Sequence, residues 1–124
     1  MTQEDKELLL KDLCARLPYG VKIQVPYEDG SGYFDEIVWE VNNDGPFHVN
    51  GWGIEYEYVK PYLFPLSSMT EKQKKEYQYI TERWMYDPSY SISDSTDWLN
   101  KNHFDYRGLI EKGLAIDATG LNIY

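Results

Sequence analysis

The chain has 124 residues, with 12 lysines and arginines against 21 aspartates and glutamates, and a formal net charge of −9 at pH 7. A chain of this length forms one domain whose core is large enough to fold without a metal or a disulfide, so we expect a single domain over 1–124. The negative charge argues against direct binding of nucleic acid, because that affinity comes largely from cations that neutralise phosphates.

The cysteine and hydropathy patterns indicate a cytoplasmic protein. Cys14 is the only cysteine and cannot form an internal disulfide, which is typical of a reducing compartment. The run Leu8–Leu10 is too short for the apolar region of a signal peptide, and charged residues flank it. No apolar run reaches the length that spans a membrane, so we expect no membrane partner.

Residues 3–17 are expected to form an amphipathic helix. Thr2 and Asp5 have the spacing of a capping box, and the sequence 18–20 (PYG) ends the helical pattern. The pattern predicts an apolar face and a polar face. The apolar face is Leu9, Leu10, Leu13, Cys14 and Leu17, and the polar face is Lys6, Glu7, Lys11 and Asp12. Cys14 is therefore expected to be buried and chemically inert.

Residues 21–59 alternate apolar and polar side chains, as half-buried strands do. The alternation predicts strands at 21–25, 37–41, 47–49 and 54–58, joined by a glycine-rich loop at 28–32 and a hairpin turn at 42–45. In the second strand it places Ile37 inward and Glu36 outward. We expect an α+β fold in which a four- to five-stranded antiparallel sheet curls toward an SH3-like barrel.

The same segment is strongly acidic. Between Ile23 and Val59 it carries eight carboxylates and no lysine or arginine. The strand pattern places four of them on the solvent side: Glu36, Glu40, Glu55 and Glu57. Such a surface attracts basic partners and repels phosphate. Trp52 lies between two glycines at a strand junction and is expected either to anchor a partner or to cover the end of the barrel.

The remainder is expected to be mainly helical over 68–113. Lys60 and Pro61 are expected to end the sheet, and the apolar segment 62–66 to pack across it. Thr70 with Gln73, or Ser68 with Glu71, supplies a capping box for a helix that extends to about residue 85. A polar loop at 89–96, a helix at 96–102, a turn at 107–112 and an edge strand at 114–116 follow.

Four short segments resemble a group of small uncharacterised single-domain proteins of gut Bacteroides. They are 13–20 (LCARLPYG), 60–63 (KPYL), 66–70 (LSSMT) and 98–110 (WLN-x-x-HFDYRGLI), and they are spread over nearly the whole chain. The resemblance implies a compact bacterial domain. It implies no activity, cofactor or partner.

Candidate catalytic groups are few. His103 and Asp105 are two residues apart, as a base and its orienting carboxylate can be, and Arg107 follows. The structural interpretation is that Asp105 caps the next turn and Arg107 pairs with a carboxylate. The two histidines, His48 and His103, have no metal-ligand spacing, and the segment 28–32 resembles a calcium loop only weakly. We therefore expect no cofactor, no metal and no enzymatic activity.

Three functional hypotheses follow. The first is a non-enzymatic protein-interaction module that binds a protein with a basic surface through Trp52 and the four glutamates. The second is an acidic inhibitor that mimics the charge of nucleic acid. The third is a small hydrolase that uses the region of His103 and Asp105. The short strand 47–49 also offers an edge through which two copies could form a homodimer.

Overall fold

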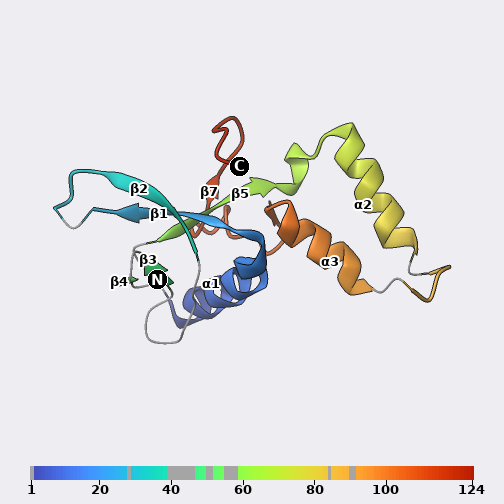
Figure 1. The fold of residues 1–124 in the computed structure, drawn as a ribbon, viewed down its shortest axis with the longest axis horizontal. Coiled ribbons are helices and arrows are strands. Elements are labelled where there is room, and N and C mark those ends of the chain that lie inside the picture. The colour runs from blue at the N-terminus through green and yellow to red at the C-terminus, as the bar shows by residue number, and fades with distance from the viewer. Residues whose placement is uncertain are drawn as a thin grey trace.

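A computed structural model of the protein describes residues 2–27, 29–38, 47–49, 52–54, 59–83, 85–89 and 92–124; for 47–49, 52–54 and 92 it describes the backbone alone. It confirms an α+β protein with an N-terminal helix, a sheet and C-terminal helices (Figure 1). The elements in chain order are α1 (Gln3–Arg16), η1 (Leu17–Tyr19), β1 (Lys22–Pro26), β2 (Tyr33–Ile37), β3 (Phe47–Val49), β4 (Trp52–Ile54), β5 (Lys60–Pro65), η3 (Leu66–Ser68), α2 (Glu71–Arg83), α3 (Ile92–Lys101), β6 (Phe104–Asp105) and β7 (Ile116–Asp117).

Helix α1 begins with the predicted capping box. The Asp5 N–H donates to Thr2 Oγ1 at 3.0 Å, and the Thr2 N–H donates to the Asp5 carboxylate at 3.4 Å. The helix passes into the 3₁₀ turn η1, which ends at Gly20 with φ +68°, a conformation that glycine adopts without steric cost. The predicted helix is thus confirmed, with its end one residue earlier than expected.

The predicted faces of this helix are wrong at two positions. The buried stripe contains Leu9, Leu13 and also Asp12 and Arg16, whereas Cys14 is exposed. Positions 9, 12, 13 and 16 have helical spacing and form one face. Asp12 and Arg16 are an acid and a base four residues apart, and they enter the interior as an ion pair.

The sheet is mixed and open rather than an antiparallel barrel. Its order is β2-β1-β5-β6, with β7 also pairing with β5, and β3 and β4 form a separate two-stranded sheet. The β1–β2 and β1–β5 pairs are antiparallel, but β6 and β7 run parallel to β5. Within the described residues, β2 and β6 do not pair to close the sheet. The predicted antiparallel SH3-like barrel is therefore corrected to an open mixed sheet.

Strand β5 forms the centre of this sheet, although the sequence predicted that the sheet ends at Lys60 and Pro61. Ile23 pairs with Pro61, Tyr62 with Ile116, and Phe64 with Phe104. The continuous apolar run from Tyr62 to Phe64 is typical of a strand that is covered on both sides. It lacks the alternation that identified the other strands, and so the pattern alone suggested a segment packed across the sheet.

The side chains of β2 face the opposite way to the prediction. Ile37 is 47% exposed, whereas Val38 is 1% exposed and belongs to the core. Glu36 pairs with the buried Ile23 and is half-buried, because directly opposed residues share one face of a sheet. Apolar residues occur on both faces of this strand, and the pairing with β1 places Phe34 and Val38 on the side of the core. Most of the strands predicted at 54–58 and at 37–41 lies outside the described residues, and Ile54 is the last residue of β4.

The core is formed where α1 packs on the sheet. Leu9 and Leu13 of the helix are fully buried with Ile23 of β1 and Leu63 of β5, and Leu109 from the C-terminal turns completes the cluster. Burial of aliphatic side chains in such a cluster is the main stabilising contribution to a fold of this size.

The C-terminal elements agree with the prediction in part. Thr70 and Gln73 form the reciprocal capping box, with hydrogen bonds of 2.9 and 3.1 Å, and α2 extends from them to Arg83. Helix α3 begins at Ile92, within the segment that was expected to be a loop. The predicted turn near 107–112 is confirmed, and the edge strand begins at Ile116 rather than 114. No helix in the described ranges is long and apolar enough to cross a membrane.

Candidate functional site at the edge of the sheet

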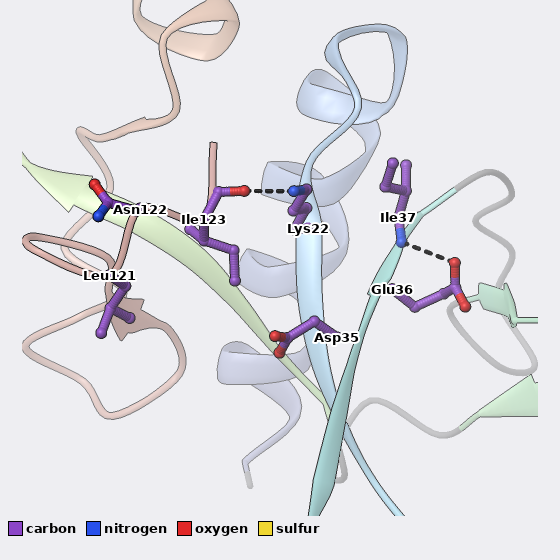
Figure 2. A pocket seen from close by; sticks show the side chains of 7 residues that line it. All are labelled: Lys22, Asp35, Glu36, Ile37, Leu121, Asn122 and Ile123. Atoms are coloured by element: carbon purple, nitrogen blue, oxygen red, sulfur yellow. Dashed lines mark hydrogen bonds between the residues drawn. The ribbon is translucent and has the colours of Figure 1, made fainter.

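A pocket of about 480 Å³ lies between the β1–β2 hairpin and residues 121–123 (Figure 2). Its strand side is lined by Lys22, Asp35, Glu36 and Ile37, and its other side by Leu121, Asn122 and Ile123. The lining thus combines two carboxylates, one ammonium group and several apolar side chains. The Lys22 Nζ donates a hydrogen bond to the Ile123 carbonyl, which joins the two sides.

Of the predicted binding residues, Glu36 lies at this pocket. Its Oε1 accepts a hydrogen bond from the Ile37 N–H at 3.3 Å, so the carboxylate folds back over the edge of β2 (Figure 2). The backbone of Trp52 is in β4, and its side chain lies outside the described part of the chain. Glu40, Glu55 and Glu57 also lie outside it. The structure therefore shows the position of one of the four predicted glutamates. The acidic face as a whole stays a prediction.

Asp35 was missed by the sequence analysis, and a hydrogen-bond chain holds it in position. The Tyr62 hydroxyl donates to Asp35 Oδ1 at 2.5 Å, and Gln24 Nε2 donates to the Tyr62 hydroxyl at 3.2 Å. Burial and the neighbouring Asp35 carboxylate raise the pKa of Tyr62 above its usual value. The alternation of Tyr33, Asp35 and Ile37 indicates that these three side chains share one face of the strand. The prediction placed Ile37, and with it this face, in the core.

Among the described residues, the edge of β2 beside this pocket has no partner strand. The Val38 N–H donates to the Val21 carbonyl at 3.0 Å and the Tyr27 N–H to the Gly32 carbonyl at 2.9 Å. In the antiparallel register of β1 and β2, hydrogen-bonded and non-bonded pairs alternate. The N–H and C=O groups of Tyr33, Asp35 and Ile37 therefore point away from β1. Over the ranges that the structure covers, β2 pairs with β1 alone.

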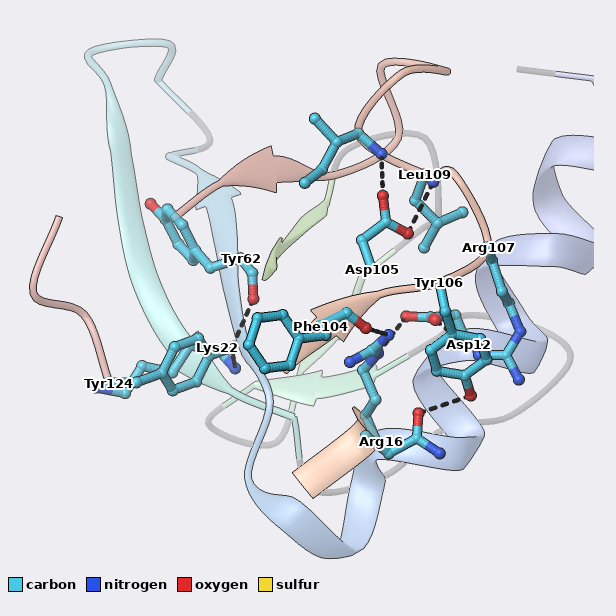
Figure 3. Close-up of polar contacts among 12 residues, drawn as sticks. Asp12, Arg16, Lys22, Tyr62, Phe104, Asp105, Tyr106, Arg107, Leu109 and Tyr124 are labelled. Carbon is cyan, nitrogen blue, oxygen red and sulfur yellow. Dashed lines mark hydrogen bonds and ion pairs between the residues drawn. The ribbon is translucent and has the colours of Figure 1, made fainter. Parts of the chain in front are cut away.

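The segment that forms the other side of the pocket is held by Tyr124 (Figure 3). The Lys22 N–H donates to the Tyr124 hydroxyl at 2.9 Å, and this hydroxyl donates to the Tyr62 carbonyl at 2.8 Å. The register of β1 and β5 would place Lys22 opposite Tyr62. The hydroxyl thus occupies the position of a ladder hydrogen bond, where the two strands diverge. Burial raises the pKa of Tyr124 well above its usual value.

We expect Tyr124→Phe to lower the free energy of unfolding by about 1–2 kcal/mol, because two backbone groups lose their partner. Hydrogen exchange of the Lys22 amide, followed by NMR, should accelerate in the variant. Tyr79→Phe is the matched control, since Tyr79 is exposed on α2. An unchanged exchange rate at Lys22 would show that the hydroxyl does not bridge the strands in solution.

His103 packs behind the same tyrosine. Its ring stacks on that of Tyr124, with 3.7 Å between the ring centroids and 10° between the planes. The residue has φ +62° and is 8% exposed, and its Nδ1 has no hydrogen-bond partner among the described atoms. Burial lowers the pKa of His103 to about 4, and the positive charges of Arg16 and Lys22 add to the effect.

This pKa predicts a pH dependence of stability. The unfolded chain takes up a proton at His103 near pH 6.5, whereas the folded chain does so only near pH 4. Lowering the pH through this interval therefore favours the unfolded chain. We expect the loss of stability between pH 7 and pH 4.5, measured by urea unfolding, to be smaller in His103→Asn, since asparagine tolerates a positive φ. His48→Asn is the control; an equal loss in both variants would contradict the prediction.

Asp105 and Arg107 have the structural roles that the sequence predicted for them. Asp105 Oδ1 and Oδ2 accept hydrogen bonds from the Leu109 and Ile110 N–H groups at 3.0 and 2.9 Å. Arg107 Nη1 donates to Asp12 Oδ1 at 2.8 Å (Figure 3). Both oxygens of Asp105 thus serve the turn. The carboxylate is not directed at His103, and the arrangement is not that of a base with its orienting acid.

Within the described residues, no group of three or more histidine, cysteine, aspartate or glutamate side chains could hold a metal ion. No family model, curated protein or solved structure matches this chain.

Proposed function

We propose that the protein is a non-enzymatic interaction module that binds a protein with a basic surface at the acidic edge of its sheet. The observation that carries the proposal is the pocket beside β2, whose lining includes Asp35, Glu36, Leu121 and Ile123. Carboxylates among apolar side chains suit a cationic side chain with an aliphatic stem. The predicted contacts of Trp52, Glu40, Glu55 and Glu57 would extend this surface. The single cysteine supports a cytoplasmic location.

The test is affinity capture from cells of the source organism, with purification of any captured protein. We expect a basic partner whose binding weakens in the double variant Asp35→Asn/Glu36→Gln and in Trp52→Ala. Glu76→Gln is a control of equal charge change per site, since Glu76 is exposed on α2, far from the hairpin in Figure 1. A purified partner that binds the double variant with unchanged affinity would overturn the proposal.

The second candidate is an acidic inhibitor that mimics the charge of nucleic acid, and the net charge of −9 favours it. The same experiment separates the two. Under this alternative the captured protein is a DNA- or RNA-binding protein, the nucleic acid displaces the module, and the complex dissociates at moderate salt. An interaction module that uses apolar contacts is expected to tolerate the same salt concentration.

A further inference from the structure

We propose that the partner binds as an extended segment that adds to the free edge of β2 and places one lysine or arginine side chain in the pocket lined by Asp35, Ile37 and Leu121. This inference rests on the proposed function and specifies how the basic partner is recognised.

Among the described residues, the outer edge of β2 has no partner strand. The backbone groups of Tyr33, Asp35 and Ile37 point outward from the sheet, as the register with β1 requires. An extended peptide satisfies such groups by adding as a further strand. The hydrogen bond from the Ile37 N–H to Glu36 Oε1 is long, at 3.3 Å, so an incoming carbonyl can replace it. That exchange releases the Glu36 carboxylate for a cation.

The pocket adjoins this edge, since three residues of β2 line it. Asp35 and Ile37 line it, and their side chains are on the face that the added strand continues. A residue directly opposite either of them in an added strand has its Cβ about 5 Å away. From there, a lysine or arginine side chain is long enough to enter the pocket. Ile37 and Leu121 suit its aliphatic stem, and Asp35 suits its charged end.

The residues that line the pocket carry more negative than positive charge. Two carboxylates line the pocket, and its one ammonium group, Lys22 Nζ, is directed to the Ile123 carbonyl. A basic segment is therefore favoured over an acidic one. A second copy of the chain is a poorer occupant, because pairing of two β2 edges would bring Asp35 and Glu36 close to the same carboxylates of the other copy.

The probe is a short peptide with blocked ends in which lysine alternates with threonine, titrated into the ¹⁵N-labelled full chain. We expect chemical-shift changes and slower amide exchange at Tyr33, Asp35 and Ile37. The same peptide with glutamate in place of lysine should not bind. N-methylation of one alternate set of peptide residues should abolish binding and methylation of the other set should not, because only one set directs its N–H groups at β2.

Two variants separate the edge from the charge. Ile37→Pro removes an outward N–H without removing a hydrogen bond to β1, and we expect it to weaken binding about tenfold or more. Ile37→Val keeps the N–H and is its control. Asp35→Asn should weaken binding of the lysine peptide severalfold and flatten its salt dependence, whereas Glu76→Gln should leave both unchanged.

The outcomes distinguish this inference from the proposed function. If the lysine peptide binds, is weakened by Asp35→Asn and is insensitive to Ile37→Pro and to N-methylation, strand addition is overturned while the acidic interaction site stands. If shifts at β2 follow protein concentration without peptide and vanish in Ile37→Pro, a second copy occupies the edge and the inference fails. If the lysine peptide does not bind, the inference fails, and the capture experiment decides the proposed function separately.

Discussion

Asp12→Ala is expected to lower the free energy of unfolding by about 3–5 kcal/mol. Asp12 Oδ2 accepts from Arg16 Nε and Asp12 Oδ1 from Arg107 Nη1, both at 2.8 Å (Figure 3). Asp12 and Arg16 are fully buried. Removal of the carboxylate therefore leaves one guanidinium buried and a second one largely buried without their shared counter-charge.

The measurement is urea unfolding followed by circular dichroism. Glu7→Ala, on the exposed face of the same helix, is the control and should change stability by no more than about 0.5 kcal/mol. The double variant Asp12→Leu/Arg16→Met should lose less than the sum of its single variants, because apolar replacement of a whole buried pair avoids the unpaired charge. Equal losses in Asp12→Ala and Glu7→Ala would show that the ion pairs do not stabilise the fold.

Asp105→Ala is expected to lower the free energy of unfolding by about 2–4 kcal/mol. The carboxylate accepts the N–H groups of Leu109 and Ile110, and Leu109 is a fully buried core residue. The variant leaves both backbone donors without this acceptor, in a turn that positions Leu109 against α1 and the sheet. Faster hydrogen exchange at the Leu109 and Ile110 amides should accompany the loss of stability.

Asp117→Ala is the matched control for this prediction. Asp117 also accepts a hydrogen bond from a turn N–H, that of Thr119, at 2.9 Å, but in an exposed turn. Water can replace the carboxylate there, so we expect a loss of less than about 1 kcal/mol. If the two aspartates prove equivalent, burial is not the reason for the strength of the Asp105 turn.

The predictions that succeeded rest on signals carried by neighbouring residues. Thr2 with Asp5 and Thr70 with Gln73 form the expected capping boxes. Asp105 caps a turn, as the capping preference of aspartate suggested. Each is decided within a few residues of the chain, where the local backbone limits the alternatives.

The predictions that failed depend on packing between distant segments. Asp12 is charged, and charged residues are usually exposed; Arg107, far along the chain, helps to neutralise it inside the fold. The residues of β2 do not by themselves decide which face of the strand is buried, because Phe34 and Val38 compete with Ile37 for the core. The pairing with β1 decides it. The candidate site was predicted only in part for the same reason. Glu36 was among the predicted binding residues, but Asp35 and Leu121 come together only in the folded chain.

The central position of β5 has a consequence for folding during synthesis. Its partners lie far from it in the chain. Strand β1 comes well before β5, and β6, β7 and the hydroxyl of Tyr124 come well after it. Pairings between distant segments form slowly, because the loops between them must be ordered first. Until residue 124 has left the ribosome, the apolar run 62–64 is expected to remain incompletely covered. A nascent chain at that stage would present it to a chaperone that binds extended apolar segments.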